Sequence, residues 1–176
     1  MSTKTVGLDF AKLTLCEALD LAIFVEEEAM DRYGEFADQL EKHRTPNAAR
    51  FFRFMEKNEA KHRAALAAKR KELFPSAAVT VTREMIFDIE APEYDEARIF
   101  MSLRQALETS LRAEHKARSF FEDALARVSS PEVKALFSEL RDEEIEHQGL
   151  VQREIDKLPP GVEPNPEDYA DEPHNQ

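Results

Sequence analysis

Apolar residues recur every three or four positions along four long segments of this chain, with polar residues between them. Such spacing places the apolar side chains on one face of an α-helix and leaves the other faces to solvent. The pattern therefore predicts four long helices, at about residues 14–41, 45–73, 102–128 and 130–158.

Four pairs of residues indicate where these helices begin. In each pair a hydroxyl residue suited to the N-cap stands either three positions before Glu or Gln, or directly before a proline. The pairs are Thr14 with Glu17, Thr45 with Pro46, Ser102 with Gln105, and Ser130 with Pro131.

The start signals also reveal an internal repeat. Thr14 and Ser102 are 88 residues apart, and Thr45 and Ser130 are 85 residues apart. The chain therefore looks like two repeats of one helix pair. The short gap inside each pair makes its two helices antiparallel. A crossover of about residues 74–101 must then join the pairs. We predict an all-α, ferritin-like antiparallel four-helix bundle, in which one long crossover joins two helix pairs.

Three segments lie outside the predicted helices. The crossover contains a β-like stretch, Val79-Thr80-Val81-Thr82. Residues 1–13 form an N-terminal segment without an apolar core of signal-peptide length. Residues 159–176 are rich in proline and acidic residues, which predicts a flexible acidic tail.

The charge of the chain excludes some classes of partner. A net charge of −12 argues against binding to nucleic acid or to an anionic membrane surface, since both attract Lys and Arg. No apolar stretch approaches the length of about 18–20 residues that crosses a bilayer. The single cysteine, Cys16, forms neither an internal disulfide nor a Cys-rich metal site, and we expect it to be a small core residue. We therefore expect a cytoplasmic protein.

Six polar residues interrupt the apolar faces near the middle of the helices. They are Glu26, Glu59, His62, Glu114, Glu144 and His147, called here the six predicted ligands. The two Glu-x-x-His pairs place a carboxylate and an imidazole one helical turn apart on the same face. Four buried carboxylates require compensating charge, and two divalent cations would supply it. Oxygen and nitrogen donors without sulfur favour two iron ions, with manganese or zinc as alternatives.

A single Glu-x-x-His in so charged a chain is most simply a surface pair. The repeat argues against that interpretation here. Of the five histidines, only His62 and His147 lie within the apolar faces, and each follows a glutamate by three residues. Glu26 and Glu114 also repeat, at an interval of 88 residues, as the start signals do.

These motifs resemble those of the rubrerythrin branch of the ferritin-like superfamily. The matching motifs are Glu26-x-x-Ala29-x-x-x-Tyr33, Glu59-x-x-His62, Glu114-x-x-Ala117-x-x-x-Phe121 and Glu144-x-x-His147. The resemblance implies terminal ligands at Glu26 and Glu114, bridging ligands at Glu59 and Glu144, and one histidine for each iron. Tyr33 is a further candidate, which could donate a hydrogen bond to a ligand carboxylate or relay an electron. The alternative is an ordinary core tyrosine with a satisfied hydroxyl.

The chain departs from the family pattern in two respects. It lacks the four cysteines of the C-terminal rubredoxin domain that rubrerythrins usually carry. Where the family has a further glutamate one turn after the third-helix ligand, this chain has Ala117. Because alanine cannot bind metal, and because the helices repeat, we expect the two halves of the site to be nearly equivalent.

The resemblance implies a di-iron oxidoreductase that oxidises Fe(II) and reduces peroxide or O₂. It also implies a homodimer, and turnover would require a separate electron-donor protein. Two alternatives remain open: an iron-handling or iron-storage protein that acts as a ferroxidase, and a metal-free helical adaptor. Neighbouring glutamates that the helical pattern directs outward, and which we do not expect to be ligands, are Glu27, Glu28 and Glu143.

Overall fold

The computed structural model describes residues 8–43, 45–86, 89–92 and 101–160. Four helices make up most of this part: α1 (Leu15–Lys42), α2 (Pro46–Leu73), α3 (Leu103–Arg127) and α4 (Pro131–Lys157). Two 3₁₀ turns accompany them, η1 (Phe10–Lys12) and η2 (Arg83–Met85). The all-α prediction is confirmed, and every helix boundary lies within one residue of the predicted position.

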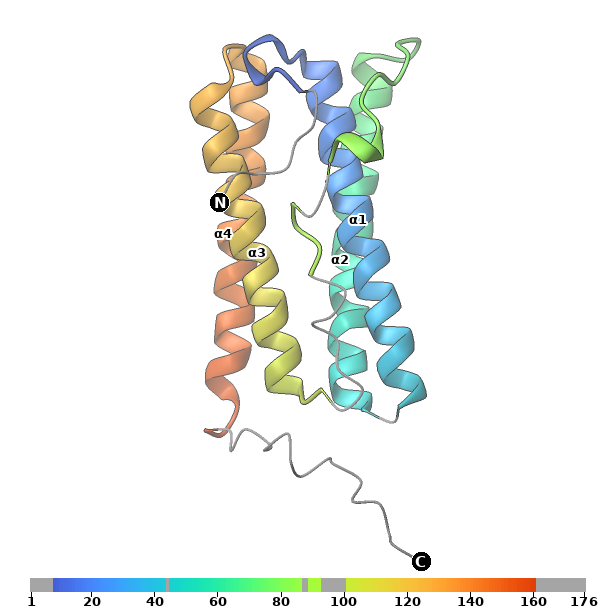
Figure 1. Ribbon diagram of the computed structural model, residues 1–176, viewed down its shortest axis with the longest axis vertical. Coiled ribbons are helices and arrows are strands. Elements are labelled where there is room, and N and C mark those ends of the chain that lie inside the picture. The colour runs from blue at the N-terminus through green and yellow to red at the C-terminus, as the bar shows by residue number, and fades with distance from the viewer. Residues whose placement is uncertain (1–7, 44, 87–88, 93–100, 161–176) are drawn as a thin grey trace, which may run out of the picture.

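The helices pack as two antiparallel pairs, α1 against α2 and α3 against α4. Figure 1 shows the pairs side by side, with the crossover running back from the end of α2 toward the start of α3. This return places the starts of α2 and α3 at the same end of the bundle, so these two helices run in the same direction. None of the described helices combines the length and apolar character that a membrane span requires.

Three of the four predicted N-caps form as expected. Thr14 and Ser102 each complete a capping box, and the Ser130 hydroxyl accepts a hydrogen bond from the Val133 amide at 3.3 Å. Thr45 occupies the N-cap position but does not cap: its hydroxyl donates to the Leu40 carbonyl at 3.0 Å. That carbonyl lies in the last turn of α1, where the helix itself supplies no donor.

Apolar side chains fill the bundle on both sides of its middle. One cluster lies toward the start of α1 and includes Leu19, Phe121 and Phe137. Others lie toward the end of α1, around Tyr33 and Phe52, and toward the end of α4, around Val151. Close packing on both sides fixes the separation of the helices at the level between the clusters, where the six predicted ligands lie.

The N-terminal segment contributes to the core as well. Asp9 caps η1, and Phe10 is buried with its ring edge-on to Phe120 at a centroid distance of 6.1 Å. The Arg127 guanidinium lies over the Phe10 ring, 4.4 Å from its centroid. Residues 1–7 and most of the predicted tail, 161–176, lie outside the described residues.

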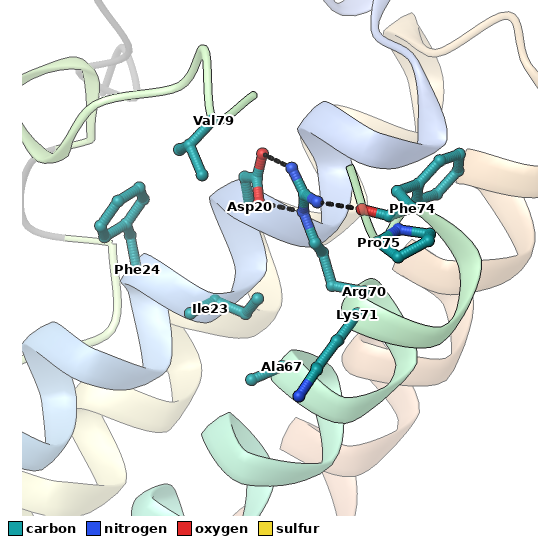
Figure 2. A pocket seen from close by; sticks show the side chains of 9 residues that line it. All are labelled: Asp20, Ile23, Phe24, Ala67, Arg70, Lys71, Phe74, Pro75 and Val79. Atoms are coloured by element: carbon teal, nitrogen blue, oxygen red, sulfur yellow. Dashed lines mark hydrogen bonds and ion pairs between the residues drawn. The ribbon is translucent and has the colours of Figure 1, made fainter. Parts of the chain in front are cut away.

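The crossover is irregular where it is described. The β-like stretch 79–82 does not form a strand; Val81 is buried, and η2 follows directly. At its start the crossover is tied to α1 through Arg70, whose Nε donates to Asp20 at 2.8 Å and whose Nη1 donates to the Phe74 carbonyl at 2.6 Å (Figure 2). A surface pocket opens beside this ion pair, and none of the six predicted ligands lines it.

Candidate metal centre

The six predicted ligands come together at mid-bundle, and all four helices contribute. Glu26 extends from α1, Glu59 and His62 from α2, Glu114 from α3, and Glu144 and His147 from α4. The four carboxylates are at most 3% exposed, whereas the imidazoles are partly exposed. Each helix presents its predicted ligands on the face that carries its buried apolar residues, which is why these polar groups point inward.

His62 lies among the carboxylates of its own helix pair. Its Nδ1 is 3.7 Å from Glu59 Oε2 and 3.8 Å from Glu26 Oε2. These separations are too long for hydrogen bonds but suit donors that surround a common point.

His147 has the corresponding position in the other pair. Its Nδ1 is 3.2 Å from Glu114 Oε2, and the Gln148 side chain donates to the Glu114 carbonyl at 3.0 Å. The His62 and His147 rings stack across the bundle with centroids 4.9 Å apart and planes inclined by 12°. The two halves of the site are therefore in direct contact.

The donor atoms fit metal ions. One atom from each of Glu59, His62 and His147 lies within 4.8 Å of the others, and so does one atom from each of Glu114, Glu144 and His147. Several buried carboxylate oxygens have no hydrogen-bond partner among the described residues, including both oxygens of Glu59 and Oε2 of Glu26 and Glu144. Buried carboxylates without donors are costly unless a cation compensates them. Carboxylate and imidazole together suit iron, manganese or zinc.

Without a cation, the carboxylates of the site bind protons tightly. Burial, with the charge of neighbouring glutamates added, raises the pKa of Glu26 and Glu144 well above the ordinary value and that of Glu59 to about 8. Burial lowers the pKa of His62, and His147 adds to this effect. Burial also opposes the charged form of His147, but the hydrogen bond and charge of Glu114 outweigh it and raise that pKa.

A seventh residue, Glu90, was missed by the sequence analysis. It lies in the crossover, is 1% exposed, and places a carboxylate oxygen within 4.8 Å of donor atoms of Glu26 and Glu59. Burial and the surrounding glutamates raise its pKa well above the ordinary value. Helical periodicity predicts which residues of a helix are buried, and it makes no prediction for a residue outside a helix. The only local signal is that apolar residues and a proline flank Glu90, in Ile89-Glu90-Ala91-Pro92.

Tyr33 is fully buried, and its hydroxyl donates to Glu114 Oε1 at 3.4 Å. The structure therefore places Tyr33 in the core, with its hydroxyl on one of the six predicted ligands. Tyr33→Phe should leave the fold intact but weaken metal binding by roughly tenfold, as loss of a donor to a ligand does. Competition with a chelator of known affinity measures this. An affinity equal to that of wild type would show that the hydroxyl does not orient Glu114.

The neighbouring acidic residues remain outside the groups of donor atoms. Glu27 is half-buried and pairs with Arg63 at 2.7 Å, and Glu143 is exposed. Glu28 is half-buried and belongs to none of these groups. Cys16 is half-buried, so the expectation of a core cysteine holds only in part.

Four helices, one long crossover and a mid-bundle cluster of glutamate and histidine define a ferritin-like bundle with a candidate dinuclear metal centre. The family model for rubrerythrin matches residues 17–155, which include all six predicted ligands. The chain therefore belongs to the rubrerythrin family.

Solved structures agree with this fold. An uncharacterized conserved protein from Magnetospirillum magnetotacticum superimposes with a TM-score of 0.66 at 27% identity, over 85% of this chain and 98% of that one. Bacterioferritin from Rhodobacter capsulatus superimposes with a TM-score of 0.55 at 22% identity, over 80% of this chain and 82% of that one. A hypothetical protein from Pyrococcus furiosus superimposes with a TM-score of 0.53 at 22% identity, over 85% of this chain and 95% of that one. No significant match is found among the curated proteins.

Proposed function

We propose that this protein is a di-iron oxidoreductase of the rubrerythrin type, which couples oxidation of Fe(II) to reduction of peroxide or O₂. The observation that carries this proposal is the set of buried carboxylate oxygens without hydrogen-bond partners, gathered around two histidines. The rubrerythrin family supports iron as the metal.

The six predicted ligands would hold the two ions and compensate their charge. Two ferrous ions bound there would supply two electrons, which with two protons convert one H₂O₂ to two water molecules. Glu59 belongs to one group of donor atoms with His62 and His147 and to another with Glu26 and Glu90, and its carboxylate would therefore hold metal beside donors from both helix pairs. Tyr33 orients Glu114 by donating to its Oε1, and Gln148 holds the backbone carbonyl of the same residue.

Solvent reaches the site from the side of the histidines. The side chains of His62 and His147 are 28% and 15% exposed, whereas the carboxylates behind them are nearly inaccessible. A small oxidant would therefore enter between α2 and α4, past the stacked rings. The apolar clusters on both sides of the site exclude water from the rest of the centre.

The family resemblance also leads us to propose a homodimer and a separate protein as electron donor. Sustained turnover needs a reductant, since each reaction consumes both electrons of the centre. Light scattering after size-exclusion chromatography tests the dimer: a monomer at micromolar concentration would contradict it.

Metal content and peroxide consumption test the function. Protein loaded anaerobically with Fe(II) should hold two iron ions per chain and consume one H₂O₂ for every two Fe(II) oxidised. With an added reductase and reductant, consumption should continue over many turnovers. Retention of many iron atoms per chain, with no sustained turnover, would favour the alternative of an iron-storage ferroxidase. Protein that binds no iron would contradict both functions.

A further inference from the structure

The crossover inserts a fifth carboxylate into the proposed metal centre. Glu90 is 1% exposed, and its Oε2 has no hydrogen-bond partner among the described residues. One of its oxygens lies within 4.8 Å of carboxylate oxygens from both Glu26 and Glu59. The third-helix position at which the family pattern has an extra glutamate is Ala117, whose buried methyl group offers no donor. The additional carboxylate of this chain therefore comes from the crossover.

The backbone around Glu90 is held from both helix pairs. The Ala91 carbonyl accepts a hydrogen bond from Lys116 Nζ of α3 at 2.7 Å, and the Pro92 carbonyl accepts one from Arg32 Nη1 of α1. Ile89 and Ala91 are also buried. In Figure 1 this piece of the crossover lies between α1 and α3, at mid-height of the bundle. These anchors hold the Glu90 side chain in the interior, away from bulk solvent.

The charge of the centre changes with this residue. Two divalent cations balance the four carboxylates of the six predicted ligands, but they leave one negative charge uncompensated when Glu90 is ionised. An ion of higher charge gains most from the extra carboxylate, because Coulomb attraction scales with the charge of the ion and is poorly screened in the interior.

We propose that Glu90 is a ligand of the metal ion on the Glu26 and Glu59 side, and that it makes this half of the centre selective for a trivalent ion. This inference rests on the metal centre of the proposed function. It replaces the near-equivalence expected from the sequence repeat, because Glu90 belongs to a group of donors with Glu26 and Glu59 but to none with Glu114 and Glu144.

Metal titration of Glu90→Gln tests the proposal without any assay of activity. The probes are Zn²⁺, and Ga³⁺ supplied as its citrate complex, since neither changes oxidation state. Wild type should bind two Zn²⁺ ions, and Glu90→Gln should weaken one of the two by roughly tenfold or more. The loss for Ga³⁺ should exceed the loss for Zn²⁺. Anomalous diffraction from the Zn²⁺-loaded crystal should place a Glu90 oxygen about 2.0–2.2 Å from one ion.

Two further variants separate ligation from charge and from folding. Glu90→Asp keeps the charge but shortens the side chain by one methylene group. If Glu90 binds the metal ion directly, this variant should also lose metal affinity. Glu143→Gln removes an exposed charge next to the ligand Glu144 and should bind both metals as wild type does. Circular dichroism of each metal-free variant verifies that it is folded.

Several outcomes would overturn the inference. Wild-type affinities in Glu90→Gln would show that Glu90 is not a ligand, while leaving the proposed function in place. An equal loss of affinity in Glu143→Gln, or full affinity in Glu90→Asp, would show that Glu90 acts through its charge alone and does not bind the metal ion. Failure of wild type to bind two ions would overturn the proposed function and this inference together.

Discussion

Removal of both bound metal ions is expected to lower the melting temperature of this protein by roughly 16–32 °C. Each ion present at 1,000 times its dissociation constant stabilises the native state by about 4 kcal/mol, and 1 kcal/mol corresponds to about 2–4 °C for a domain of this size. The structural reason is the cost of the empty centre, where Glu26, Glu59 and Glu144 keep carboxylate oxygens buried without hydrogen-bond donors.

Calorimetry of metal-loaded and chelated protein measures this difference. Glu59→Ala and Glu144→Ala should each abolish most of it, because each removes a central donor and also relieves the metal-free protein of a buried carboxylate. Glu143→Gln, at an exposed position on the same helix as Glu144, should keep the full difference in melting temperature. An equal shift upon chelation in wild type and both alanine variants would show that stabilisation comes from metal bound elsewhere.

The metal-free protein should become less stable as the pH rises from about 5 to about 8. Burial raises the pKa of Glu26, Glu59 and Glu144 above their ordinary value of 4.5, and that of Glu59 reaches about 8. A group whose pKa is higher in the folded state binds more protons there than when unfolded. Its contribution to stability is therefore complete below pH 4.5 and is lost as the pH passes through the folded value. Each excess proton corresponds to about 1.4 kcal/mol per pH unit.

Stabilisation by bound metal should change with pH in the opposite sense and increase as the pH rises. Ligand carboxylates must be ionised to bind a cation, so that metal affinity increases with pH. The difference in melting temperature between loaded and metal-free protein should consequently widen between pH 5 and pH 8, which thermal unfolding in a series of buffers measures. Glu59→Gln removes one of the titrating groups and should flatten the curve of the metal-free protein. A metal-free wild type whose stability rises over this range would contradict the assignment of protonated carboxylates to the centre.

Local patterns in the sequence were sufficient to predict the helices and the inward position of the six predicted ligands. A helix repeats every 3.6 residues whatever surrounds it, so apolar spacing alone determines which side of α1 or α4 is buried. Capping boxes at Thr14 and Ser102 depend on side chains three residues apart, which the chain itself brings together. The repeat of 85 and 88 residues then placed the ligands of both helix pairs at matching depths.

Residues outside this periodicity enter the core and the centre through contacts that depend on the packing of the whole chain. Phe10 is buried because the end of α3 offers it Phe120 and Arg127. Glu90 stands beside Glu26 because Lys116 and Arg32 hold the crossover from two different helices. Each of these contacts joins segments that the sequence separates and no local period relates, so their meeting depends on how the whole chain packs.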